Sequence, residues 1–265
     1  MCIATAAPAT AVPPLLCSSL TVFAIESCTR RCIFLSRVSI TVFPATGSEF
    51  GILDYCGFPK DEAWYLRSQW TQDVVLHILP HWNLKGREGE GIPVWVYTNC
   101  DKVELKVNGR SLGRKECPKY GYLEWDAVYR PGYVEAIGWK NGVRVARERI
   151  ETTGEAVKAN AKMEQSVDII VANVDLVDAE GRLVPDACDT VSVAIDPSLQ
   201  LLGWGNGDPA MRDPDHPEPV SESGSGLSVR IGEASDDNAS IYRLPAFNGH
   251  FQMILRPITR KYERK

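Results

Sequence analysis

The sequence predicts a mainly β protein, with two β-sandwiches in tandem preceded by one strand and one helix. Short apolar-alternating segments with a turn signal every 8–12 residues fill residues 93–150, which is typical of a sandwich. The pattern restarts near residue 166 and runs to residue 255. Only residues 51–72 have the order strand, loop and helix, which is typical of the end of an α/β domain.

Composition is that of an ordinary soluble globular chain. The 265 residues are 44% hydrophobic and 24% charged, which suits one or two domains. The net charge of −5 and the lack of a basic stripe argue against a nucleic-acid partner. No uninterrupted run of about 20 apolar residues is present, so no membrane partner is expected. Eight cysteines occur without a CxxC pair, and the four after residue 50 are interpreted as unpaired buried thiols.

Residues 1–46 differ from the rest, because they are rich in Ala, Ser, Thr, Cys and Pro and contain Glu26 as their single acid. They are interpreted as a leader, a disordered arm or sequence outside the fold. Residues 3–25 are apolar, but they lack a basic start and are interrupted by Pro13 and Pro14, which makes a weak signal peptide. The localisation therefore stays open between cytoplasmic and secreted.

The first regular elements follow directly. Residues 51–53 predict a buried strand end, and residues 55–59 a loop with Gly and Pro. Pro59 suits the first position of a helix, and Ala63, Leu66 and Trp70 form a stripe at helical spacing. Asp61 and Glu62 are interpreted as first-turn charges that favour the helix dipole.

Residues 74–82 predict a strand that opens the first sandwich. His77 and His81 have the spacing of a metal pair on a helix, but Pro80 between them favours a strand and a turn, so no metal is expected. The pairs Asn108-Gly109 and Asn141-Gly142 predict two-residue hairpin turns. Alternation places Trp95 and Trp125 in the core.

The second sandwich begins with a strand over residues 166–178, with Val167, Ile169 and Val171 on one face. Further strands are expected at 191–195, 199–202 and 242–255. Residues 203–209, GWGNGDP, predict a Gly-rich turn that leaves Trp204 exposed. This turn lacks the Lys-Ser/Thr ending of a nucleotide loop. Its Asn and Asp could hold a cation, but beside Gly they more simply build a tight turn. Residues 212–240 predict a long solvated loop.

Several motifs occur in a fixed order: HWN, TNCDKVELKVNGRSLG, YRPGYVEAIGWKNG, TTGE, GWGNGDP and AFNGHFQMIL. This ordered set resembles the C-terminal part of β-galactosidases of glycoside hydrolase family 2. The resemblance covers about residues 47–257.

The resemblance implies a domain organisation. Residues 47–73 would be the last strand and helix of a truncated catalytic (β/α)8 barrel. Residues 74–156 and 157–257 would be two immunoglobulin-like sandwiches, the second with the loop 212–240. Residues 1–46 and the basic tail 258–265 would lie outside them.

The resemblance also implies a chemistry. Family members are retaining glycosidases with two glutamates about 5 Å apart on barrel strands. Nothing before Gly47 resembles those strands, so no catalytic residue is expected here, and neither a metal nor a cofactor. The segment that contributes to the wall of the sugar pocket corresponds to Ser48, Glu49, Phe50, Asp54 and Tyr55. A carboxylate pair among Glu49, Asp54, Asp61 and Glu62 is disfavoured, since one strand does not make a barrel.

Three hypotheses follow. The first is a fragment, inactive alone, of an enzyme that hydrolyses terminal β-galactosides. The second is a non-enzymatic carbohydrate-binding or interaction module that uses Trp204 and the loop 212–240 for glycan contact. The third is a purely structural buttress of a barrel or a homo-oligomer, which predicts a bare apolar face around Ile52, Leu53, Trp64 and Trp70.

Overall fold

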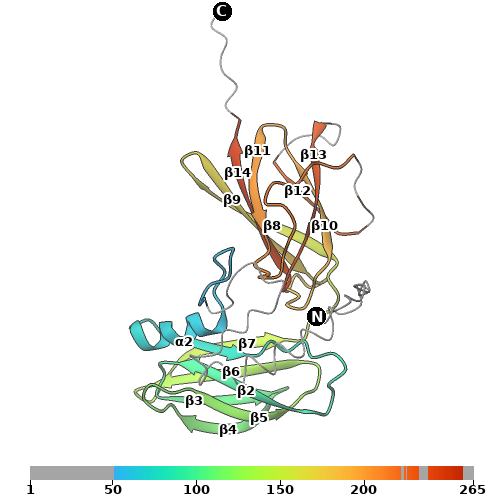
Figure 1. The fold of residues 1–265 in the computed structure, drawn as a ribbon. Coiled ribbons are helices and arrows are strands. Elements are labelled where there is room, and N and C mark those ends of the chain that lie inside the picture. The colour runs from blue at the N-terminus through green and yellow to red at the C-terminus, as the bar shows by residue number, and fades with distance from the viewer. Residues whose placement is uncertain (1–50, 222–223, 225, 233–237, 259–265) are drawn as a thin grey trace, which may run out of the picture. The chain divides into compact units, whose positions relative to one another are not determined.

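The computed structural model describes residues 51–221, 224, 226–232 and 238–258. The expectations for residues 1–46, for Ser48, Glu49 and Phe50, and for the basic tail after Ile258 lie outside this part of the chain. The described residues are mainly β, with one α-helix, α2 (Asp61–Trp70), and fourteen strands in four sheets (Figure 1). This confirms the predicted β class.

Residues 76–151 form two antiparallel sheets. One has three strands in the order β1-β2-β5, and the other has four in the order β4-β3-β6-β7. Their bounds are β1 Leu76–Leu79, β2 Gly91–Thr98, β3 Lys102–Val107, β4 Arg110–Glu116, β5 Leu123–Val128, β6 Tyr133–Lys140 and β7 Val143–Glu151.

One hydrophobic core joins these two sheets. Val94 and Trp125 come from the first sheet, and Val103, Leu105 and Val134 from the second. All five side chains are buried, which is the arrangement expected of a β-sandwich. The predicted core position of Trp125 is confirmed, whereas Trp95 is buried on the opposite face of its sheet, outside this core.

Both predicted hairpin turns are confirmed by their backbone angles. Asn108 and Gly109 have φ of 48° and 82°, and Asn141 and Gly142 have φ of 53° and 78°. Two successive residues with positive φ define the type I′ turn, whose twist matches that of the strands. The first turn joins β3 to β4, and the second joins β6 to β7.

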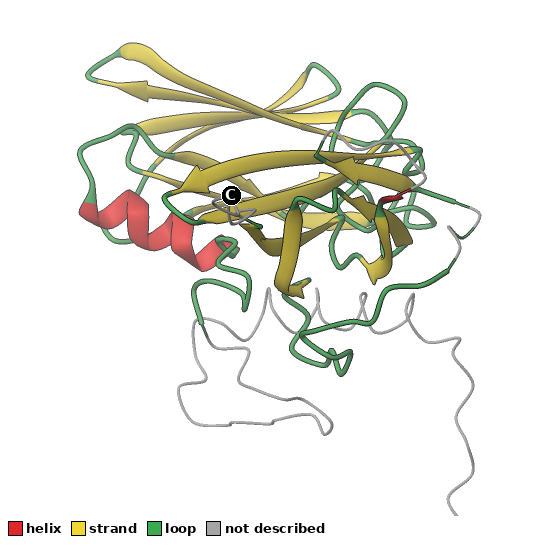
Figure 2. Ribbon diagram, turned by 90° about the horizontal axis from the view of Figure 1, so that it is seen from above, coloured by secondary structure: helices red, strands yellow, loops and turns green. Residues whose placement is uncertain are grey.

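Helix α2 lies alongside the strands and covers β2 (Figure 2). Its Trp64 and Tyr65 pack against Trp95 and Tyr97, which point away from the main core and form a separate cluster with Tyr122. Strand β2 is therefore buried on both faces, as its unbroken apolar run from Val94 to Tyr97 allows.

The expected helix start at Pro59 is wrong, since α2 begins at Asp61 with Lys60 as its N-cap. Pro59 instead bridges to Leu53, and the Lys60 N–H donates to the Ile52 carbonyl, which keeps both residues in the preceding loop. The stripe that ends at Trp70 does not mark the packed face, because Trp70 is 83% exposed.

Residues 158–257 form the other two sheets. One has the order β11-β14-β9-β8 and is antiparallel, while the other has the order β12-β10-β13, with β12 parallel to β10. Their bounds are β8 Lys158–Ser166, β9 Ile169–Val177, β10 Thr190–Ile195, β11 Leu199–Gly205, β12 Ser228–Ile231, β13 Ser240–Pro245 and β14 His250–Pro257.

A second core lies between these sheets. Phe251, Met253 and Leu255 of β14 are fully buried, as their alternation predicts. Trp204 belongs to the same core. It is 7% exposed, and its indole N–H donates to the Pro214 carbonyl at 2.9 Å. The expected exposure of Trp204 is therefore wrong, because it lies on β11 before the turn begins and its ring packs inward.

Two further expectations are corrected. The segment predicted as one strand from residue 166 contains the turn of the β8–β9 hairpin, and Val167 sits there with φ of 27° and 91% exposure. The buried face of β9 starts at Ala172 instead. The loop 212–240 is not wholly irregular, because it includes β12 and a bridge from Val220 to Ile241.

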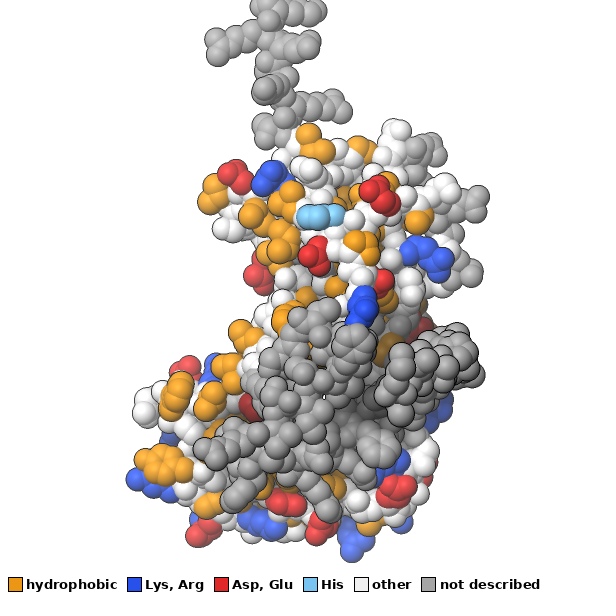
Figure 3. Space-filling view, viewed as in Figure 1, with side chains coloured by type: hydrophobic (Ala, Val, Ile, Leu, Met, Phe, Trp, Pro, Cys, Tyr) orange, Lys and Arg blue, Asp and Glu red, His pale blue; other side chains and the backbone are white. Residues whose placement is uncertain are grey.

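The two large cores draw their residues from 78–136 and from 159–255. The finer domain boundaries, the immunoglobulin-like topology and the origin of residues 51–73 in a barrel stay predictions. Acidic and basic side chains intermingle over the described part of the face shown in Figure 3. Among the described residues, no helix is long and apolar enough to cross a membrane.

Candidate functional site

The loop before α2 contains two of the predicted site residues, Asp54 and Tyr55. It is closed by backbone bonds from Asp54 N–H to the Phe58 carbonyl at 3.0 Å and from Gly57 N–H to the Asp54 carbonyl at 3.1 Å. The Asp54 carboxylate accepts from the N–H groups of Cys56 and Phe58 at 2.8 and 2.9 Å. Gly57 has φ of 82°, which suits glycine. Asp54 is thus the organiser of its own turn.

This loop is held against the strands β11 and β14. The Phe58 and His250 rings lie 4.2 Å apart between centroids, and His250 Nε2 is 3.9 Å from Asp54 Oδ2. A Cβ atom at Gly207 would collide with the Asp54 carboxylate, and one at Gly205 would lie 3.0 Å from Cys56 Sγ. The Gly-rich turn predicted at GWGNGDP therefore accepts the loop at close range.

The docked loop shifts the pKa of two side chains. Burial acts to raise the pKa of Asp54, but His250 and the Phe58 and Cys56 N–H groups outweigh it, so the pKa lies below its usual value. Burial and the neighbouring Asp54 charge raise the pKa of the Cys56 thiol to about 11. Cys56 is therefore a protonated, unreactive thiol at neutral pH.

Two residues of the predicted pocket wall, Asp54 and Tyr55, lie in the described part of the chain. Tyr55 is 58% exposed, next to Asp54 in the same loop, while Ser48, Glu49 and Phe50 lie outside the described residues. Trp204, which was predicted as a possible glycan contact, is buried. Ile52, Leu53 and Trp70 are exposed, as the structural hypothesis predicted, whereas Trp64 stacks on His77 with 5.0 Å between ring centroids.

Sequence reasoning missed a charged cluster under α2. His77 Nε2 lies 2.9 Å from Asp61 Oδ1, and His77 Nδ1 lies 3.6 Å from Glu148 Oε1 on β7. Burial acts to lower the pKa of His77, but the two carboxylates outweigh it and raise the pKa to about 9. His77 is thus an imidazolium that joins α2 to β1 and β7, a role that no local pattern signals.

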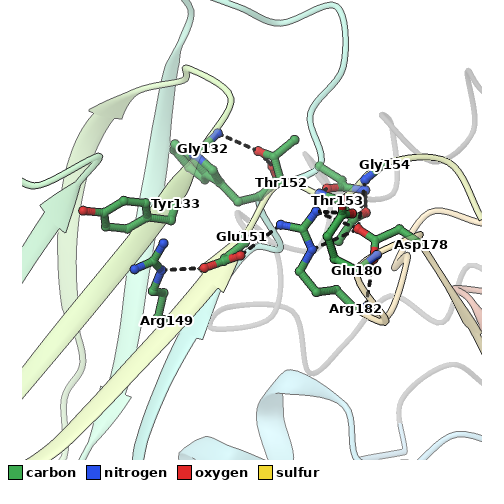
Figure 4. A network of polar contacts seen from close by, with 12 residues as sticks. Gly132, Tyr133, Arg149, Glu151, Thr152, Thr153, Gly154, Asp178, Glu180 and Arg182 are labelled. Atoms are coloured by element: carbon green, nitrogen blue, oxygen red, sulfur yellow. Dashed lines mark hydrogen bonds and ion pairs between the residues drawn. The ribbon is translucent and has the colours of Figure 1, made fainter.

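A second polar network joins the end of β7 to the turn after β9 (Figure 4). Arg182 Nη1 lies 2.9 Å from Glu151 Oε2, and Arg182 Nη2 lies 2.7 Å from Asp178 Oδ2. The Gly154 N–H also donates to Asp178. Burial acts to raise the pKa of Asp178, but these donors outweigh it and lower the pKa to about 2.

Asn83, which follows β1, forms hydrogen bonds to residues 152–154, the segment that contains Gly154. Its amide Nδ2 donates to Thr153 Oγ1 at 2.6 Å and to Asp186 Oδ1 at 2.8 Å, and its Oδ1 accepts from the Thr153 N–H at 2.7 Å. Residues 152–154, which run from the first pair of sheets to the second, are therefore held by side chains from both.

No group of three or more His, Cys, Asp or Glu side chains suited to a metal ion occurs among the described residues. Among the described cysteines, Cys56, Cys100 and Cys117 carry free thiols, as expected. Cys100 is buried, as predicted, whereas Cys56 and Cys117 are half-buried and Cys188 is exposed. The described residues thus offer docked loops and ion pairs, with Tyr55 as the exposed side chain of the predicted wall.

Comparison with known proteins finds one matching family and several similar glycosidases. Residues 89–146 match a family described as a domain of unknown function, DUF4982. A β-galactosidase of Bacteroides ovatus is 36% identical over 176 residues, which are 63% of this chain and 20% of that protein. A β-glycosidase from Bacteroides vulgatus superposes with a TM-score of 0.67 at 29% identity, over 81% of this chain and 26% of its own.

The chain is similar to the C-terminal part of family 2 glycoside hydrolases. A family 2 member from Bacteroides cellulosilyticus shares the fold, with a TM-score of 0.63 at 22% identity over 80% of this chain and 29% of that one. A β-glucuronidase of Formosa agariphila is 29% identical over 60% of this chain and 17% of its own length. The chain thus spans about a fifth of the length of the curated relatives it matches.

Proposed function

We propose that this chain is a C-terminal β module of a β-glycoside hydrolase whose intact form cleaves terminal β-galactosides with retention, and that it is inactive alone. The observation that carries this is the 36% identity to a β-galactosidase over 176 residues. Residues 1–46 do not resemble the strands that hold the family's glutamates, which supports inactivity.

In this proposal, residues 51–73 are the end of a barrel and the four sheets are two trailing sandwiches of immunoglobulin type. Exposure of Ile52, Leu53 and Trp70 supports it, because apolar side chains at the end of a barrel would be covered by the remainder of that barrel. Tyr55 would then face the rim of the sugar pocket, as the family resemblance implies, and Asp54 would shape the turn that carries it.

The test is hydrolysis of nitrophenyl β-galactoside and nitrophenyl β-glucuronide by the purified chain and by a chimera. In the chimera, residues 51–258 replace the matching segment of the Bacteroides ovatus enzyme. We expect no turnover by the chain and β-galactoside turnover by the chimera, with none by the enzyme lacking that segment. Turnover by the chain alone, or an inactive but folded chimera, would contradict the proposal.

The β-glucuronide substrate is included for the assay of the chain alone, because one relative of similar coverage is a β-glucuronidase. The chimera uses the catalytic barrel of its host. It therefore tests whether residues 51–258 can replace the host segment, and it does not test which sugar the intact form prefers. The preference of the intact form would be read from its own barrel.

A second candidate is a non-enzymatic carbohydrate-binding module of tandem sandwiches. The half-exposed Tyr55 favours it, since an exposed aromatic ring can stack on a sugar. Titration of the chain against a glycan panel tests this candidate, with Tyr55→Ala as the altered variant and Tyr120→Ala, another exposed tyrosine, as the matched control. Binding that Tyr55→Ala does not weaken would remove it.

A further inference from the structure

The loop 54–59 makes its docking contacts with one particular part of the molecule. Phe58 and Asp54 meet His250 at the start of β14, while Cys56 and Asp54 meet Gly205 and Gly207 at the end of β11. Strands β11 and β14 are paired neighbours in one sheet. The loop therefore contacts one edge, which is formed by the adjacent ends of these two strands.

Two features show that this edge is shaped for the loop. Gly207 has φ of 80°, and any side chain there would occupy the space of the Asp54 carboxylate. Asn206 is buried, donates to the Pro245 carbonyl at 3.1 Å and accepts from the Asp208 N–H at 3.1 Å, which fixes the turn that presents Gly207. Hydrogen bonds outside the loop thus hold the turn that receives it.

We propose that His250 is a positioning residue, which acts through Asp54 and Phe58 to set the place of Tyr55. Strands β11 and β14, and not the helix that follows the loop, then determine where this tyrosine lies. The inference rests on the proposed function for the meaning of Tyr55 as part of a sugar-pocket rim, whereas the docking itself stands on the contacts above.

The thiol of Cys56 reports the docking directly, because it is half-buried against Gly205 and is freed when the loop lifts. The experiment is alkylation of the full chain with iodoacetamide, followed residue by residue by peptide mass spectrometry. His250→Ala should speed alkylation of Cys56 about tenfold or more, because local opening removes its burial. Exposed Cys188 and buried Cys100 serve as internal references and should not change.

Three variants separate positioning from general loosening. His216→Ala removes an exposed histidine and should leave Cys56 unaffected. His250→Gln keeps an N–H donor where Nε2 stands and should restore most of the protection. Phe58→Ala removes the opposite side of the contact without touching β14, so it should speed Cys56 even if His250→Ala loosens the whole chain.

An unchanged Cys56 rate in both His250→Ala and Phe58→Ala would overturn the inference, and so would a His250→Gln variant as reactive as His250→Ala. The thiol readout needs no glycosidase activity. Failure of the docking is therefore seen in the thiol rates, while failure of the proposed function is seen in the chimera assay.

Discussion

His77 Nε2 lies 2.9 Å from Asp61 Oδ1, so a charge pair joins the first turn of α2 to strand β1. Glu148 approaches the other ring nitrogen at 3.6 Å, and Trp64 stacks on the ring. Because Asp61 is half exposed while His77 is largely buried, the pair is stronger than a surface salt bridge and weaker than a fully buried one.

The stability of α2 docking should depend on pH through His77. Its pKa is raised to about 9 from 6.5, so the stabilisation is fully present below about pH 6.5 and is lost as the pH rises through 9. We expect His77→Gln to lower the free energy of unfolding by about 1–2 kcal/mol at pH 6, and by much less at pH 9.5. Urea denaturation at both values measures it, with His216→Gln as the control. A cost that is the same at both values would show that His77 contributes by packing alone.

The network at Arg182 should contribute to stability through Asp178. Arg182→Ala leaves the buried Asp178 carboxylate without its guanidinium, which should cost about 1–3 kcal/mol. The control is Lys85→Ala, whose ion pair with Glu155 is exposed on both sides and should matter little.

The same pair gives an acid dependence of known sign. The pKa of Asp178 is lowered to about 2 from 3.8, so its stabilisation is present above about pH 4 and is lost as the pH falls through 2. The difference in unfolding free energy between the native chain and Arg182→Ala should therefore shrink between pH 4 and pH 2. A difference that stays constant over this range would mean that Arg182 acts without Asp178.

Gly138 on β6 should tolerate no side chain. A Cβ there would lie 2.6 Å from the sulfur of buried Cys100, so Gly138→Ala should cost about 1–3 kcal/mol by overpacking. Gly91→Ala is the matched control, because Gly91 also lies in a strand and has open space around it. In the double variant with Cys100→Ala the new methyl group has room, so the summed costs should exceed the measured one. Strict additivity in thermal unfolding would disprove the proposed contact.

Truncation of Trp204 and of Trp70 should change the free energy of unfolding by very different amounts. Trp204→Ala removes a core ring and a hydrogen bond and should cost about 3–5 kcal/mol. Trp70→Ala removes a ring that is 83% exposed and should change the unfolding free energy by less than about 0.5 kcal/mol. Acrylamide quenching of tryptophan fluorescence, compared between the native chain and each of the two variants, provides a second readout. Equal costs would contradict the burial of Trp204.

The predictable parts of the fold are those with local signals. Asn108-Gly109 and Asn141-Gly142 need positive φ at both positions, and this requirement is visible in the residues themselves. The β8–β9 turn was missed because Val167 and Asp168 carry no such signal. Strand β12 was missed because its partner, β10, lies far away in the chain and pairs with it in parallel.

The site shows the same limit. The family resemblance implies that Asp54 is part of the pocket wall, which stays a prediction. No local pattern indicates that its carboxylate accepts from the N–H groups of its own turn and lies near His250. His77 was weighed as a partner of His81, whereas its partners are Asp61 and Glu148, which are 16 and 71 positions away. Ion pairs of this kind depend on tertiary packing, which a single sequence does not encode in any short pattern.

The burial of β2 on both faces has a consequence for the handling of the protein. Residues 94–97 are apolar and β-prone, with aromatic rings that α2 covers on one side. If residues 51–73 are removed, that face of the sheet becomes an exposed apolar patch, through which copies of the chain can associate. The helix is thus a shield against self-association, and a shortened chain beginning at Val74 should precipitate where the full chain stays dissolved.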